Sequence, residues 1–301
     1  FMEQVHKVAI IGGTTFDHIV YLPDFPLPEP HTIHKALLNE TTGSTGSGKA
    51  LTLTKLGIDN TLYSVTGDDY YGNLIKEEIK KSGVKAIFDT DPAGTERHIN
   101  IMDANGGRVS IFATQSSENI AYNIPAIEKL LEESTIIVLN IISYCRGLIP
   151  LIKKYNKPVW TDLHDYDGSN SYHQDFIDAS QFIHLSSDNL PDYKLVMEQF
   201  IKDGKEMVIC THGKDGASLL TKQGEWLEQP IVNGIEIVDS NGAGDSFFSG
   251  FLYGYLNNQP LRKCLQYGAV CGAYAVVSQT LVYENLSPVF LEEKRKIHFG
   301  D

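Results

Sequence analysis

The sequence contains no long apolar run. No stretch of its 301 residues approaches the roughly 18 consecutive apolar residues that a membrane-spanning helix needs. The first residues, FMEQVHKVAIIGG, also differ from a secretory signal peptide, because their apolar run of about five residues is shorter than the hydrophobic region of such a peptide. We therefore expect a cytoplasmic protein without a membrane partner.

Positive charge and cysteine motifs are also scarce. The chain has 25 Lys and Arg residues against 38 Asp and Glu residues, a formal net charge of −13. This balance argues against general nucleic-acid binding, which needs a basic surface, although a local basic pocket for a phosphorylated ligand stays compatible with it. The cysteines lack the CxxC or Cys/His spacing of a metal site and are typical of core residues in a reducing compartment. They are Cys145, Cys210, Cys264 and Cys271.

Short β-rich runs alternate with helical stretches over most of the chain. Such alternation predicts an α/β fold in which helices cover a parallel sheet. The clearest helix is NLIKEEIKKSG, an amphipathic segment that ends at a glycine. The predicted strands cover 8–13, 61–67, 135–140, 158–163, 182–185 and 206–213, and the predicted helices cover 49–57, 73–83 and 148–155.

Two stretches interrupt this alternation. Residues 31–42 and 97–114 alternate apolar and polar side chains without an intervening helix, and the second contains the turn signal Asn105-Gly106-Gly107. They predict antiparallel strands with one exposed face. We expect a single domain, residues 1–301, with lid strands inserted at about 14–42 and 95–115.

The stretch GSTGSGKA (43–50) looks like a P-loop, whose pattern is G-x-x-x-x-G-K followed by Ser or Thr. Gly43, Gly48 and Lys49 have the right spacing, but Ala50 stands where the magnesium-binding hydroxyl should be. A P-loop also needs a strand that runs directly into its glycines, and the preceding NETT fits that poorly. A P-loop NTPase is therefore the least favoured alternative.

A stronger signal lies at GIEIVDSNGAGDSFFSGFLYGYL (234–256). A predicted strand, IEIV, runs through a small-residue turn into an apolar helix. Backbone N–H groups of Gly242, Ala243 and Gly244 would point outward at the helix start and form an anion hole. Asp245 would lie beside that hole, where a carboxylate can accept the proton of an attacking hydroxyl. The alternative is an ordinary aspartate at the start of a helix.

The same string carries a resemblance to a known family. DSNGAGDSFFSGF resembles the D-[TS]-x-G-A-G-D signature of the ribokinase-like (PfkB) sugar kinases at every fixed position. GGTTFDHIVYLPDFPLPEPHTI (12–33), TGDDYYGNLIKEEIKKSGV (66–84) and VICTHGKDGASLL (208–220) are similar to other segments of that family, in the same order. The resemblance covers nearly the whole chain.

This resemblance implies a three-layer, Rossmann-like sandwich with a small β-sheet lid, and magnesium–ATP as the phosphoryl donor. It also leaves room for a monovalent cation such as K⁺ and for a homodimer formed through the lid. Asp245 would be the catalytic base, and the turn at Gly242–Gly244 would be the anion hole. The residues that would line the nucleotide are Thr211, Gly213, Gly216 and Asn241, and those that would bind the acceptor are Thr15, Asp17, Gly43, Ser44 and Gly48.

The acceptor loop departs from the family pattern G-G-x-x-x-N-x-A. Its second glycine is Ser44, and Gly48 replaces the asparagine that would bind a sugar hydroxyl. Either the hydroxyls of Ser44, Thr45 or Ser47 replace the lost contacts, or the pocket admits a bulkier acceptor.

A second departure follows the strand at 182–185. The family commonly has N-x-x-E there, which helps to organise magnesium, whereas this chain has Ser186-Ser187-Asp188-Asn189. Asp188 could take over part of that role. TDLHDYDG (161–168) suggests a metal site, but Asp162 ends a strand where the family also carries an aspartate, so we do not expect one.

The leading hypothesis is an ATP-dependent kinase that phosphorylates a hydroxymethyl group of a sugar or sugar-like acceptor. A nucleoside kinase of the same family is the nearest alternative, and a non-catalytic ligand-binding homologue is less favoured. Arg97 and His98 could touch the acceptor, but solvated lid residues are the simpler interpretation.

Overall fold

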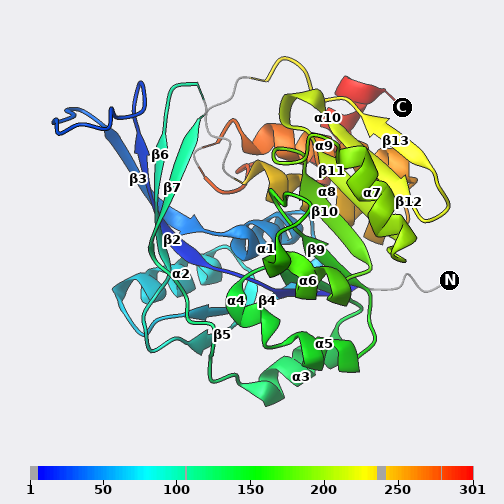
Figure 1. Ribbon diagram of the computed structural model, residues 1–301, viewed down its shortest axis with the longest axis horizontal. Coiled ribbons are helices and arrows are strands. Elements are labelled where there is room, and N and C mark those ends of the chain that lie inside the picture. The colour runs from blue at the N-terminus through cyan, green and yellow to red at the C-terminus, as the bar shows by residue number, and fades with distance from the viewer. Residues whose placement is uncertain (1–5, 106, 236–241, 279, 301) are drawn as a thin grey trace.

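The computed structural model describes residues 6–105, 107–235, 242–278 and 280–300. Its main sheet has nine strands in the order β13-β12-β11-β10-β9-β8-β1-β4-β5 (Figure 1). These strands are β1 (Lys7–Ile11), β4 (Asp59–Thr66), β5 (Lys85–Thr90), β8 (Ile136–Asn140), β9 (Val159–Asp162), β10 (Phe182–Ser186), β11 (Met207–Thr211), β12 (Ala217–Thr221) and β13 (Trp226–Gln229). Neighbours from β11 to β5 pair in parallel, whereas β12 and β13 are antiparallel additions at one edge.

Helices cover both faces of the main sheet, so the molecule has three layers (Figure 1). Val8 and Ile10 of β1 pack into one core, and Ala9 and Ile11 pack into the core on the opposite face. Both faces of a central strand are therefore apolar, as expected for a parallel sheet. On the Val8 side lie α1 (Thr45–Lys55), α2 (Tyr70–Lys81), α8 (Ala243–Leu256), α9 (Leu261–Ala275) and α10 (Pro288–Phe299). On the other side lie α3 (Ile124–Glu133), α4 (Ser143–Arg146), α5 (Ile149–Lys154), α6 (Gln174–Ala179) and α7 (Tyr193–Lys202), with a 3₁₀ helix at Ser171–His173. A second 3₁₀ helix covers Gly213–Asp215, between β11 and β12.

A second sheet of four strands projects from the main body, in the order β3-β2-β6-β7 (Figure 1). Its strands are β2 (Thr15–Tyr21), β3 (Leu37–Gly43), β6 (Arg97–Met102) and β7 (Arg108–Thr114). The prediction of a strand over the whole of 31–42 is wrong for its first half. β3 begins only at Leu37, which lies opposite Tyr21, the last residue of β2, so the chain before it has no partner strand.

The strand order reverses beside β1. The chain builds β1, β4 and β5 outward on one side, and β8 then returns to the other side of β1. In open α/β sheets, ligands bind outside the carboxyl ends of the strands at such a reversal. Gly12 and Gly13 follow β1 there, and Asn140 ends β8. No helix among the described residues is long and apolar enough to cross a membrane.

Candidate functional site

Asp245 lies in the first turn of α8, which confirms the predicted helix after the glycine turn. Gly242 precedes that helix with a φ of 77°, and a Cβ atom there would come within 2.5 Å of the Leu281 carbonyl oxygen. Only glycine fits this position. The first N–H groups of a helix have no partner within it and carry partial positive charge, so the turn can bind an anion. The predicted strand IEIV and Asn241 fall largely or wholly within 236–241, outside the described residues.

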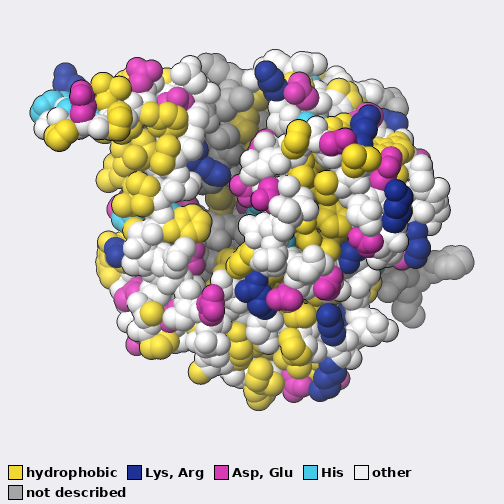
Figure 2. All heavy atoms as spheres, in the orientation of Figure 1, with side chains coloured by type: hydrophobic (Ala, Val, Ile, Leu, Met, Phe, Trp, Pro, Cys, Tyr) yellow, Lys and Arg dark blue, Asp and Glu magenta, His cyan; other side chains and the backbone are white. Residues whose placement is uncertain are grey.

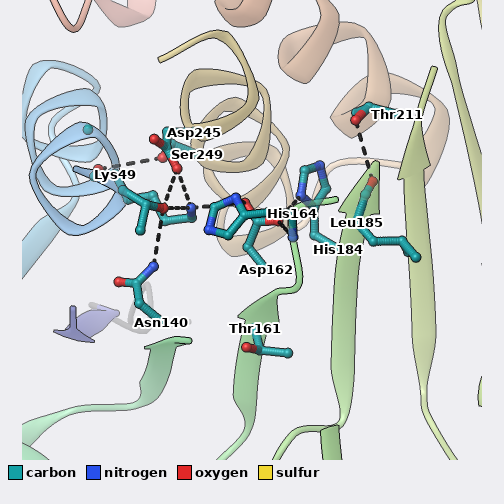
Figure 3. A network of polar contacts seen from close by, with 12 residues as sticks. Lys49, Asn140, Thr161, Asp162, His164, His184, Leu185, Thr211, Asp245 and Ser249 are labelled. Atoms are coloured by element: carbon teal, nitrogen blue, oxygen red, sulfur yellow. Dashed lines mark hydrogen bonds and ion pairs between the residues drawn. The ribbon is translucent and has the colours of Figure 1, made fainter. Parts of the chain in front are cut away.

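The side chain of Asp245 is bound by two residues of α1 (Figure 3). The Thr45 hydroxyl donates to Oδ1 at 2.5 Å, and the Lys49 ammonium forms an ion pair with the same oxygen. The Asp245 side chain is 13% exposed, and Lys49 is completely buried. Within the part of the chain that the structure describes, both contacts are to Oδ1, so they fix the carboxylate and leave Oδ2 for another partner.

Gly48 makes room for this carboxylate. A Cβ atom added at Gly48 would lie 3.1 Å from both Cβ and Oδ2 of Asp245, which is tighter than an ordinary contact. The family asparagine at this position would therefore push against the carboxylate in its present place. Gly48 and its neighbour Lys49 therefore both bear on Asp245: the glycine leaves space for its carboxylate, and the lysine forms an ion pair with it.

Lys49 also reaches Asp162 at the end of β9, with 3.0 Å between Nζ and Oδ2. The other oxygen of Asp162 lies 3.0 Å from Nδ1 of the buried His184 and accepts the backbone N–H of His164. Burial opposes ionisation of Asp162, but the charges of His164, Lys49 and His184 outweigh it and hold its pKa well below the ordinary value. We did not predict a role for Lys49; its position in the false P-loop pattern drew attention to the triphosphate instead.

Asn140, the last residue of β8, completes the network by donating to the Thr45 hydroxyl at 3.2 Å (Figure 3). That hydroxyl also accepts from Lys49 at 2.5 Å and donates to Asp245. Its one proton and two lone pairs are thus all used. Thr45 is a part of the carboxylate's support and is not free to replace the missing asparagine.

A second group of polar side chains gathers around Asp17 on β2. Thr15 donates to Asp17 Oδ1 at 2.7 Å, and Asn100 of β6 donates to Oδ2 at 3.4 Å. Gly43 faces the same carboxylate, since a Cβ atom there would lie 2.1 Å from Oδ2. Burial raises the pKa of Asp17, against the opposing effects of Thr15, His98 and Arg108. The predicted acceptor residues Thr15, Asp17 and Gly43 therefore come together in one polar cluster.

The simpler interpretation as a solvated residue is wrong for His98, whereas Arg97 is half-buried. The His98 side chain is 14% exposed, stacks on Phe112 with 3.9 Å between ring centroids, and lies 3.8 Å from Asp17. The Arg97 guanidinium packs over the ring of Tyr71. Both side chains are held because the small sheet lies against α2 and carries Asp17 on the next strand.

Ser44, the residue before α1, has φ 77° and ψ 158°. This backbone region is essentially reserved for glycine, and the family has a glycine there. Ser44 is therefore a residue with a side chain in a conformation that favours glycine. Ser47, another candidate hydroxyl, is fully buried in α1. Ser44 is half-buried and is the remaining hydroxyl of the three that could face an acceptor.

Thr211, Gly213 and Gly216 lie at the end of β11 and in the turn to β12. Thr211 donates to the Leu185 carbonyl at 3.4 Å, on the far side of His184 from Asp245 (Figure 3). These residues therefore lie beyond His184 and are not part of the hydrogen-bond network around Asp245 among the residues drawn. Figure 2 shows a hollow between the small sheet and the main body.

The segment Ser186–Asn189 is organised by the backbone and by a histidine. The Asp188 N–H donates to the Ser186 hydroxyl, and the Ser187 hydroxyl lies 2.9 Å from Nδ1 of His212. Asp188 itself is exposed. Among the described residues there is no group of three or more His, Cys, Asp or Glu side chains that could hold a metal ion. A magnesium ion bound by one or two carboxylates and phosphate oxygens does not need such a group.

Comparison with known proteins gives four informative similarities. A family model described as pfkB family carbohydrate kinase matches residues 176–286. The acarbose 7(IV)-phosphotransferase of Actinoplanes sp. (strain ATCC 31044 / CBS 674.73 / SE50/110) is 31% identical over 278 residues, which cover 91% of this chain and 93% of that protein. The solved structure of a microbiome-derived acarbose kinase, Mak1, has a TM-score of 0.87 at 28% identity and covers 97% of this chain and 99% of that one. The nucleoside kinase of Methanocaldococcus jannaschii, an archaeal member of the ribokinase family, has a TM-score of 0.76 at 19% identity and covers 97% of this chain and 99% of that one. This last similarity supports the ribokinase-like fold.

Proposed function

This chain belongs to the PfkB family of carbohydrate kinases and is an ATP-dependent carbohydrate kinase. From that premise, we propose that Asp245 is the base that activates a hydroxymethyl group of a sugar or sugar-like acceptor. The observation that carries the proposal is the position of Asp245. Its carboxylate lies in the first turn of α8, next to the Gly242–Gly244 turn, with Oδ1 fixed by Thr45 and Lys49.

In the proposed reaction, Oδ2 of Asp245 accepts the proton of the acceptor hydroxyl. The oxygen attacks the γ-phosphorus of ATP in line, and the bond to the β–γ bridging oxygen breaks as ADP leaves. The N–H groups of Gly242, Ala243 and Gly244 face the charge that develops on the transferring group. Magnesium, when bound with ATP, neutralises part of the phosphate charge, and K⁺ dependence is a further proposal to be checked by omission of K⁺.

We place the acceptor at Asp17 and the nucleotide at the end of β11. A carboxylate supported by Thr15 and Asn100 can accept hydrogen bonds from two neighbouring hydroxyls of an acceptor. Thr211, Gly213 and Gly216 would line the nucleotide. The small sheet, which joins the body through β2 and β3, would close over the acceptor as a lid of one kinase domain, residues 1–301, and exclude water.

Acarbose is the first acceptor to test, because two similar proteins are named for it. Gly48 supports an unusual acceptor, since it removes the amide that the family uses for a sugar hydroxyl. A nucleoside acceptor is the second candidate, supported by the similarity to a nucleoside kinase. ADP release should be measured with acarbose, ribose, fructose 6-phosphate and adenosine. Stimulation by adenosine alone would overturn the sugar assignment.

The Asp245→Asn variant tests the proposed base. The amide keeps the size of the side chain but cannot accept the proton, so turnover should fall by about 10²–10⁴-fold, the usual contribution of a general base. ATP binding, measured by calorimetry, should be retained. Near-normal turnover in this variant would refute the assignment. Retained ATP and acceptor binding with no ADP formed by the unaltered protein would instead support a non-catalytic homologue.

We also propose that two copies pair through the outer face of the small sheet. The register places Leu38, Ile101, Val109 and Ile111 on that face, away from Asp17, and three of them are 44–64% exposed. Figure 2 shows apolar side chains gathered over this sheet. The Ile111→Lys variant should run as a monomer in sedimentation analysis, whereas Ile297→Lys, an equally drastic change at an exposed residue of α10, should leave the assembly unchanged. An unaltered protein that sediments as a monomer would overturn this proposal.

A further inference from the structure

Lys49 is unusual because its side chain is completely buried, which is rare for lysine. It projects from α1 with no exposed surface, among buried neighbours that include Gly48, Ala50 and Leu53. A buried ammonium group is costly unless it is paired and hydrogen-bonded. Here its partners are two carboxylates and one hydroxyl, and the ring of Phe248 lies 4.8 Å from Nζ.

Lys49 is held in its charged form. Burial would lower its pKa, but the carboxylates of Asp162 and Asp245 outweigh that effect and raise it. The ammonium has three N–H donors, and Asp162, at 3.0 Å, takes one of them. Thr45 takes another, and the third goes to Asp245, the proposed base. The contact with Asp245 places the buried cation directly on the carboxylate oxygen opposite the one that would take the acceptor's proton.

The surrounding charges come from four parts of the fold. Asp245 faces the ammonium from α8, and Asp162 faces it from β9. His184, on β10, lies 3.0 Å from Oδ1 of Asp162, and His164, in the loop after β9, lies 3.7 Å from Oδ2, the oxygen that also pairs with Lys49. Lys49 thus lies between two carboxylates, and the ion pairs of the two histidines are with Asp162.

We propose that Lys49 is a positioning residue for phosphoryl transfer, which fixes Oδ1 of Asp245 and leaves Oδ2 to take the acceptor's proton. This inference rests on the proposed role of Asp245. Lys49 gives up no proton in the reaction: the proton moves from the acceptor hydroxyl to Asp245, and the phosphoryl group moves from ATP to the acceptor oxygen. An opposite charge within about 4–6 Å favours the charged form of a carboxylate, so removal of the ammonium should be visible in the pH profile of turnover.

The test compares pH profiles of turnover in three variants. Lys49→Met alone would leave two buried carboxylates without their cation and could prevent folding, so it is combined with Asp162→Asn, which removes one of them. In this double variant the acid limb of the kcat profile should move to higher pH by about one unit, so that turnover on that limb falls by up to about tenfold relative to the unaltered protein, while the shift has no effect at pH 8.5. The acceptor KM should change less than about threefold, because Asp17 is untouched.

The single variant Asp162→Asn keeps the ammonium beside Asp245, so its pH profile tests the proposal even if the double variant does not fold. The acid limb of its kcat profile should lie at the same pH as that of the unaltered protein or at a lower pH, because Lys49 then pairs with Asp245 alone. Lys205→Met is the matched control. Lys205 is also a buried lysine, 8% exposed, but it donates to the backbone carbonyls of Ile177 and Ser180 and should leave the profile unchanged.

The outcomes separate the two proposals. The role of Lys49 would be overturned if the double variant folds and the acid limb of its kcat profile coincides with that of the unaltered protein. It would also be overturned if Asp162→Asn alone moves that acid limb to higher pH. If Asp245→Asn abolishes turnover in that case, the proposed base still stands. If Asp245→Asn retains turnover, the proposed function fails first, whatever the pH profiles show.

Discussion

Replacing Ser44 with glycine should stabilise the protein. Ser44 has φ 77° and ψ 158°, a conformation that costs a residue with a side chain about 1–3 kcal/mol. Glycine removes that strain but adds about 0.4–1 kcal/mol of unfolded-state entropy that folding must overcome. The free energy of unfolding should therefore rise by roughly 1 kcal/mol, which corresponds to about 2 °C in Tm for a chain of this size.

Equilibrium unfolding in urea measures this change. Ser44→Gly should raise the midpoint at an unchanged slope, because the surface exposed on unfolding stays the same. Ser44→Ala is the control: it removes the hydroxyl but keeps Cβ, so the strain remains and no stabilisation is expected. A Ser44→Gly variant that is no more stable than Ser44→Ala would refute the strain argument.

The same pair of variants separates stability from binding. Ser44 lies against the end of β1, where a Cβ atom at Gly13 would come within 2.5 Å of its hydroxyl. If that hydroxyl contacts the acceptor, both variants should raise the acceptor KM severalfold while only the glycine variant gains stability. Equal KM values in all three proteins would show that the hydroxyl plays no part in acceptor binding.

Three further variants probe the two polar clusters. Gly48→Asn restores the family residue but places a Cβ atom 3.1 Å from Asp245, so turnover in an ADP-release assay should fall about tenfold. Gly48→Ala adds the same Cβ atom and should show most of this loss. A fully active Gly48→Asn protein would show that Asp245 can move aside freely. Asp17→Asn should raise stability at neutral pH while weakening acceptor binding. The pKa of Asp17 is raised in the folded protein, so its ionisation costs stability as pH rises from about 3.9, the unfolded value, through the folded value. Thermal unfolding at pH 4 and pH 8 should therefore show a larger gain for Asp17→Asn at pH 8, and an equal gain at both would contradict the burial argument.

Much of the architecture could be predicted from local patterns. The alternation of strands and helices follows from hydrophobic periodicity, which is a property of neighbouring residues, and α8 follows from a glycine turn and an apolar run. The antiparallel edge formed by β12 and β13 was not predicted, because pairing direction depends on which strand lies alongside. The start of β3 at Leu37 has the same cause, since it is set by the end of β2.

The sequence by itself identified the family, the glycine turn and the carboxylate at Asp245, because these depend on residue types at short spacings. Only the tertiary structure brought Lys49 to Asp245 and Asp162, which lie 196 and 113 residues away along the chain. It likewise turned Gly48 from a missing sugar contact into the space that Asp245 occupies. Packing of α1 against α8 and the ends of β8 and β9 decides these contacts, and no local pattern encodes which buried charge meets which.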